Sequence, residues 1–267
     1  MKFKLNLKKF LFATGFNVER ISATKDIIFF ISQFNKNYKF TELIRVGPDG
    51  DGGYLLPDIL KNISYCFSAG VGEISKFEKH LSRNFKIKSF MADASVNSPP
   101  EYDDNFIFIK KYLGSKTYGE YISLSDWLKE SLGNDQKQKI LQMDIEGSEY
   151  EVLTYESAET LSKFSLILVE FHGLQNLYNR NFLKMISAIF QKIYMNFSIC
   201  HVHPNNASGF YGLNNIKIPS CLEVTFVRND LLPNIKKAEK INLPHPLDQK
   251  TFHKNPEIIM PEIWWKK

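Results

Sequence analysis

Apolar and polar positions follow a pattern that predicts short buried strands separated by helices. Apolar runs predict strands at residues 63–69, 87–92, 105–113, 140–145, 166–171, 197–202 and 222–227. Helical spacing of apolar residues predicts helices at 76–85, 121–132 and 182–193, with Ser125 as the N-cap of the second. Strands that alternate with helices indicate an α/β fold with a seven-stranded, mostly parallel sheet and helices on both faces.

The flanks of this pattern predict two additions to a central domain at residues 41–232. Residues 1–40 are expected to form a helical extension packed on the core, and the Pro-rich residues 233–267 to form a tail that wraps the domain. The start of the chain is basic, but its apolar stretch at 11–16 is shorter than a usual signal-peptide core, and no apolar run reaches the ~18 residues of a membrane span. A basic amphipathic helix lying on the domain is expected, with weak contact to an anionic membrane surface as the alternative.

Composition narrows the class of protein. The 267 residues are 43% hydrophobic, which excludes a disordered chain. The net charge of +5, from 34 basic and 29 acidic residues, is too mild for a nucleic-acid-binding surface. Cys66, Cys200 and Cys221 are too few for a disulfide framework and have no zinc-type spacing, so we expect a reducing, cytoplasmic location.

Chemistry-bearing residues follow the predicted strands, where α/β sheets bind ligands. Gly70 and Gly72 follow the first strand, and Asp93 follows the second, at the spacing where an acid commonly binds ribose hydroxyls. The third glycine of the dinucleotide fingerprint is missing, which favours a nucleoside cofactor without a pyrophosphate; a plain turn is the alternative. The glycine-rich segment 45–54, with Asp51, suits a loop at a site, although an exposed hairpin would have the same composition.

Acids and histidines follow the later strands. Asp144 and Glu146 end the fourth strand, Glu170 and His172 the fifth, and His201 and His203 the sixth. Acids at this edge can hold a cationic ligand or a divalent metal, while capping of the next helix is the alternative for the first pair. Three of the 6 histidines thus follow two strands, and each on its own is equally compatible with packing or surface exposure.

Several motifs resemble FkbM-type methyltransferases. They are Asp51–Tyr54 (DGGY), Gly70–Gly72, Tyr121–Leu128 (YISLSDWL), Lys139–Glu149 (KILQMDIEGSE) and Leu166–His172 (LILVEFH), and the resemblance covers roughly residues 42–230. It implies a class I, Rossmann-like fold that binds S-adenosylmethionine and O-methylates a sugar or another hydroxyl acceptor. Among the partners it implies are a small molecule or glycan, including a nucleotide-linked sugar.

The resemblance also assigns roles within the cofactor site. It implies that Gly70 and Gly72 approach the cofactor, that Asp93 accepts its ribose hydroxyls and that Asp144 lies near its sulfonium. The family usually has an acid and an asparagine in the first turn, where this chain has Ser68 and Val71. Glu73 or Asp51 is expected to substitute for that acid.

Two catalytic schemes and two rival functions remain open. His172 is the first candidate for the base that deprotonates the acceptor, followed by His201 or His203. Alternatively, Asp144, Glu170, His172 and His201 or His203 bind a divalent metal, for which Mn or Fe suits the mixed ligands better than Mg. The rivals are a nucleotide-sugar or dinucleotide enzyme, disfavoured by the missing glycine, and a degenerate fold that only binds a partner, favoured by the altered turn.

Overall fold

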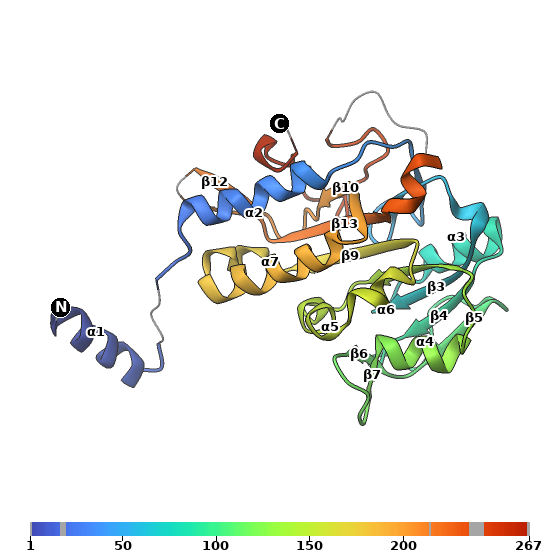
Figure 1. The fold of residues 1–267 in the computed structure, drawn as a ribbon, viewed down its shortest axis with the longest axis horizontal. Coiled ribbons are helices and arrows are strands. Elements are labelled where there is room, and N and C mark those ends of the chain that lie inside the picture. Colours follow the sequence, from blue (N-terminus) through green and yellow to red (C-terminus); the bar gives the residue numbers. More distant parts are fainter. Residues whose placement is uncertain (1, 17–19, 214, 235–242, 266–267) are drawn as a thin grey trace.

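A seven-stranded sheet forms the centre of the protein (Figure 1). The computed structural model describes residues 2–16, 20–213, 215–234 and 243–265. In spatial order, the strands of the sheet are β10 (Phe197–Pro204), β13 (Cys221–Arg228), β9 (Leu166–His172), β8 (Gln138–Met143), β3 (Ile63–Ala69), β4 (Lys88–Ala92) and β5 (Phe106–Ile109). The sheet is mixed, because β13 runs antiparallel to both β10 and β9, whereas every other neighbouring pair is parallel.

All the helices except the first pack on one of the two faces of the sheet (Figure 1). The helices are α1 (Lys2–Ala13), α2 (Thr24–Asn37), α3 (Lys76–Phe85), α4 (Leu124–Leu132), α5 (Glu149–Tyr155), α6 (Ala158–Ser162) and α7 (Arg180–Tyr194), with short turns η1 (Leu60–Asn62), η2 (Leu174–Tyr178), η3 (Asn229–Asn234) and η4 (Glu262–Trp264). Alternate strand residues point to opposite faces. Phe67 and Leu141 therefore join the larger core with α2, α4, α5 and α7, whereas Cys66 and Ile140 join the second core with α3.

Three two-stranded sheets complete the fold. The pairs are β1 (Leu43–Val46) with β2 (Tyr54–Pro57), β6 (Tyr112–Gly114) with β7 (Tyr121–Ser123), and β11 (Phe210–Leu213) with β12 (Ile216–Pro219). The β1–β2 hairpin packs on the second core through Val46 and Leu56. Its connecting loop is the glycine-rich segment with Asp51, so that segment is both a hairpin connection and, as described below, part of a cavity.

Two predicted elements differ from the observed ones. The predicted strand 105–113 is wrong in its second half: β5 ends at Ile109, and Tyr112 begins β6 in another sheet, because Lys110 and Lys111 interrupt the apolar run. The predicted helix 121–132 begins only at Leu124, after β7. Its N-cap is Ser123, whose side chain accepts the N–H of Asp126, and not Ser125.

The N-terminal extension and the tail meet on one face. α2 packs against α7 through Phe30 and Phe190, whose rings meet edge-on, and Trp264 of the tail lies edge-on to Phe34 of α2 with ring centroids 5.1 Å apart. α1 stands away from the sheet in Figure 1. Residues 235–242 and 266–267 of the predicted tail lie outside the described residues. Among the described helices, none has the length and apolar character needed to cross a membrane.

Candidate active site

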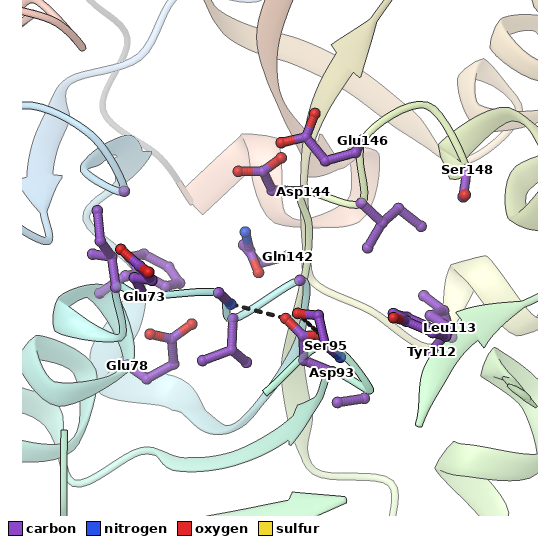
Figure 2. Close-up of a pocket in the computed structure, with 18 of the residues that line it drawn as sticks. Glu73, Glu78, Asp93, Ser95, Tyr112, Leu113, Gln142, Asp144, Glu146 and Ser148 are labelled. Atoms are coloured by element: carbon purple, nitrogen blue, oxygen red, sulfur yellow. Dashed lines mark hydrogen bonds between the residues drawn. The ribbon is translucent and has the colours of Figure 1, made fainter. Parts of the chain in front are cut away.

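A cavity of about 740 Å³ opens at the carboxyl ends of β3, β4 and β8 (Figure 2). All six residues expected at the cofactor line it: Asp51, Gly70, Gly72, Glu73, Asp93 and Asp144. Glu78 and Glu146 add two further carboxyl groups. Among the described residues that line the cavity, none is a lysine, arginine or histidine. The cavity is therefore suited to a cationic ligand and poorly suited to a pyrophosphate.

The glycine turn brings two strand ends close together. Gly70 has φ +85°, and a Cβ atom there would lie 1.6 Å from the carbonyl oxygen of Asp144. Glycine is thus required at this position by the approach of β8 to β3. Gly72 also has a positive φ, +50°, but a Cβ there would meet open space. The two glycines therefore differ in role, since only the first is fixed by close contact within the protein.

Asp93 is fixed by hydrogen bonds from two sides. Its Oδ2 accepts the N–H of Gly72 at 2.8 Å, and its Oδ1 accepts the N–H of Ser95 at 2.8 Å and the hydroxyl of Ser95 at 2.6 Å (Figure 2). The carboxylate therefore connects the glycine turn after β3 to the end of β4. A carboxylate has about four acceptor positions, so one remains for a ligand hydroxyl.

Glu78 is a site residue that the sequence did not indicate. It comes from α3, is 3% exposed, and has one carboxyl oxygen 2.5 Å from Ser68 Oγ. Ser68 Oγ also lies 2.8 Å from the amide oxygen of Gln142, whose amide nitrogen donates to the hydroxyl of Tyr54. Burial raises the pKa of Glu78, and the contact with Ser68 opposes that rise. A carboxyl group from α3 thus lies beside the Ser68 hydroxyl near the end of β3.

His172 lies at the centre of four carboxyl groups. Its Nδ1 is 3.0 Å from Glu149 Oε1. Its Nε2 is 3.7 Å from Asp144, 3.5 Å from Glu146 and 3.8 Å from Glu170. Asp144 and Glu146 line the cavity, whereas His172 does not. The imidazole is therefore connected to the cavity through the two acids near its Nε2 atom.

This arrangement shifts two pKa values strongly. Burial, reinforced by the negative charge of Glu170, raises the pKa of Asp144 to about 8, although His172 opposes the shift. Burial alone would lower the pKa of His172, but the hydrogen bond and charge of Glu149, with Glu170 and Asp144, outweigh it and raise that pKa to about 9. A cation bound beside Asp144 would lower both values, because a positive charge favours the carboxylate and disfavours the imidazolium.

His201 and His203 belong to a different group. Both point from β10 toward Asp248 of the tail, with His201 Nε2 2.8 Å and His203 Nδ1 3.3 Å from Asp248 Oδ1. Neither histidine lines the cavity. Glu170 lies between the two groups along the sheet, and its Oε1 accepts Asn205 Nδ2 at 2.7 Å and lies 2.8 Å from Cys221 Sγ.

Of the expected metal ligands among the described residues, Asp144, Glu170 and His172 meet around the His172 ring, whereas His201 lies in another cluster. Asp144 and His172 converge with Glu149, Glu170 and His172 converge with Cys221, and His201 converges with His203 and Asp248. His201 is thus placed apart from the other three residues of the expected set. The metal role of that set stays a prediction.

Comparison with known proteins connects this geometry to a family. The family model described as Methyltransferase FkbM domain matches residues 59–197, which is more than half of the chain and includes β3, β4, β8 and β9. No curated protein matches the chain. The matched residues include the glycine turn, Asp93, Asp144 and His172.

Proposed function

Because this chain belongs to the FkbM methyltransferase family, we propose that it is an S-adenosylmethionine-dependent O-methyltransferase acting on a hydroxyl of a sugar or glycan. The observation that carries the proposal is the cavity beside Gly70, which is lined by carboxyl groups and by no described basic side chain. S-adenosylmethionine carries a sulfonium, an ammonium and a carboxylate, so it is a net cation, and it has no phosphate. An acidic cavity favours this ligand over a dinucleotide or a nucleotide-linked sugar.

The residues of the cavity fit such a cofactor. Asp93 offers an acceptor to the ribose hydroxyls, and the rings of Tyr54, Phe77 and Tyr112 line the same space as partners for adenine. The Oδ1 atom of Asp144 is buried and has no hydrogen-bond partner among the described residues, which suits a cationic sulfur nearby. When bound, the cofactor supplies an electrophilic methyl group.

Glu78 supports a functional cofactor site over a degenerate one. The degenerate alternative is based on Ser68, where the family has an acid. Glu78 places a carboxyl group against the Ser68 hydroxyl and lines the cavity, so acidic character is restored from a neighbouring element. We propose that Glu78 takes the role expected of Glu73 or Asp51, although both of these also line the cavity.

In the proposed reaction, His172 removes the acceptor proton. Glu149 accepts the Nδ1 proton of His172, which leaves Nε2 as the basic atom facing Asp144 and Glu146. A neutral sugar hydroxyl is a weak nucleophile, and a positioned base contributes about 10²–10⁴-fold to such reactions. Because the pKa of His172 is about 9, the imidazole must first lose its proton, and a cation beside Asp144 favours that loss.

The experiment that tests the proposal is methyl transfer from S-adenosylmethionine with a labelled methyl group. The purified chain is incubated with neutral oligosaccharides and, separately, with nucleotide-linked sugars, and the products are analysed by mass spectrometry. Label on a sugar oxygen is expected, with the neutral acceptors preferred. Transfer only to a non-sugar acceptor would contradict the proposed acceptor class. If the chain binds the cofactor but transfers no methyl group, the alternative of a degenerate fold that only binds a partner would be favoured.

A chelation experiment separates the two catalytic schemes. Activity is measured before and after complete removal of divalent ions with EDTA. Deprotonation by His172 predicts that activity survives chelation. Loss of activity that returns with Mn²⁺ or Mg²⁺ but not with Zn²⁺ would favour the metal-assisted scheme at Asp144 and His172.

A further inference from the structure

The second histidine cluster lies outside the proposed active site. His201 and His203 are two residues apart on β10 and therefore project from the same side of the strand. Asp248 reaches them from the tail, more than 40 residues later in the sequence. Its Oδ1 faces both imidazoles, while its Oδ2 accepts the backbone N–H of His245 at 2.7 Å. Three side chains from two distant segments thus converge on one point.

The cluster is buried and incompletely hydrogen-bonded. His201 and His203 are each 3% exposed, and the Asp248 side chain is 4% exposed. Within the described residues, His201 Nδ1 and both ring nitrogens of His203 have no hydrogen-bond partner. Buried polar atoms normally have partners, so the unpaired His203 Nδ1, which lies 3.3 Å from Asp248 Oδ1, indicates that a ligand belongs between these two atoms.

We propose that His201 Nε2, His203 Nδ1 and Asp248 Oδ1 bind a divalent transition-metal ion, for which Zn²⁺ is the best fit. Two imidazoles and a carboxylate form a ligand set typical of zinc. Zinc–nitrogen bonds of about 2.0–2.1 Å in a tetrahedron place neighbouring ligand atoms roughly 3.3 Å apart. The observed separations of 2.8 and 3.3 Å are close to that value, and the set leaves a fourth position open.

The position of the cluster gives the ion a structural consequence. Leu247, next to Asp248, accepts a hydrogen bond from Arg45 Nη1 at 3.4 Å. Arg45 Nη2 also donates to the carbonyl of Gly50 at 3.1 Å, in the loop that carries Asp51 into the cavity. An ion at the cluster would therefore fasten the tail to β10 and, through Arg45, stabilise the loop at the edge of the proposed cofactor site.

This site is independent of the proposed catalytic chemistry. None of its three ligands lines the cavity, and His172 belongs to a separate group of carboxyl groups. Its existence can therefore be tested without measuring methyl transfer. Failure of this test would leave the proposed function unaffected.

The test is metal binding by the full chain. The protein is freed of metal with a chelator, then titrated calorimetrically with Zn²⁺ and, separately, with Co²⁺, whose visible absorption reports tetrahedral coordination. One ion per chain, a tetrahedral cobalt spectrum and a higher melting temperature with Zn²⁺ are expected. No binding by the wild-type chain at millimolar Zn²⁺ would overturn the inference and leave the cluster as a hydrogen-bonded contact.

Variants locate the ion. His203→Ala and Asp248→Asn are expected to lose both the cobalt spectrum and the thermal shift, whereas His253→Ala, an exposed histidine of the same tail, keeps them. Circular dichroism without metal checks that each variant is folded, and His203→Ala and Asp248→Asn test the same site independently. Wild-type binding by both variants, or loss of binding in His172→Ala instead, would overturn the inference.

Discussion

Glu149 and His172 form a buried pair in which Glu149 Oε1 lies 3.0 Å from His172 Nδ1. Glu149 is 0% exposed, and the same oxygen accepts the backbone N–H groups of Ile145 and Gly147. One carboxylate from α5 thus holds both the loop after β8 and the imidazole at the end of β9. Glu149 therefore affects both the loop that lines the cavity and the protonation of His172, the proposed base.

The pair predicts an alkaline activity profile. His172 is flanked by the carboxyl groups of Asp144, Glu146, Glu149 and Glu170, and its pKa is raised to about 9. A raised pKa means that the basic form accumulates only as the pH rises through about 9. In wild type, kcat/KM is therefore expected to increase with pH up to this region. A rise of kcat/KM centred near the ordinary histidine pKa of about 6.5 would contradict this assignment.

Glu149→Gln should move the rise of kcat/KM to lower pH. The substitution removes the negative charge that raises the pKa of His172 while keeping an oxygen for the loop N–H groups. Glu146→Gln is the matched control, because its carboxylate lies 3.5 Å from His172 Nε2 but its side chain is 86% exposed, where solvent screens its charge. Equal profiles for Glu149→Gln and wild type would argue against the pair.

His172→Ala should separate catalysis from binding. Loss of the base is expected to lower kcat by about 10²–10⁴-fold. The Kd for S-adenosylmethionine should remain close to the wild-type value, because His172 does not line the cavity. The exposed His253→Ala variant serves as the control and should retain full turnover. Normal turnover by His172→Ala would show that the base is another group.

Asp144→Asn tests the proposed contact with the sulfonium. S-adenosylmethionine is cationic at sulfur and S-adenosylhomocysteine is not, so a carboxylate beside the sulfur favours the first ligand. The variant is expected to lose about tenfold in affinity for S-adenosylmethionine, equivalent to about 1.4 kcal/mol, with a smaller loss for S-adenosylhomocysteine. Equal losses for the two ligands in calorimetric titrations would place the sulfur elsewhere.

The two glycines of the turn should differ in their tolerance of alanine. Gly70→Ala places a Cβ 1.6 Å from a backbone oxygen, so the ends of β3 and β8 must separate. A loss of more than about 4 kcal/mol in unfolding free energy, or failure to fold, is expected. Gly72→Ala meets no atom and should cost only about 1–2 kcal/mol for its left-handed backbone. Urea denaturation measures the unfolding free energy of both variants. Equal losses would contradict the close approach of Gly70 to the Asp144 carbonyl.

The sequence predicted the strands and the edge of the sheet that carries the site. Buried strands form continuous apolar runs, so the ends of these runs identified Gly70, Asp93 and Asp144, which meet in the cavity. The run at 105–113 was misleading because two strands of different sheets follow each other with only Lys110 and Lys111 between them.

Contacts between distant elements could not be predicted in the same way. Glu78 carried only a weak signal, as a charged residue on the apolar side of a helix between Phe77 and Leu81. Asp248 carried none, because its contact with His201 depends on the path of the tail. The ring of carboxyl groups around His172 arises from three elements, so its effect on the pKa follows only from the fold.

Calorimetric titration with S-adenosylhomocysteine tests the proposed cofactor site most directly. Wild type and Asp93→Ala are compared, with melting curves confirming that both are folded. Binding by wild type well below about 1 mM is predicted, with a loss of at least about tenfold in Asp93→Ala. No binding by the folded wild-type chain up to about 1 mM would contradict the assignment of this acidic cavity to the cofactor.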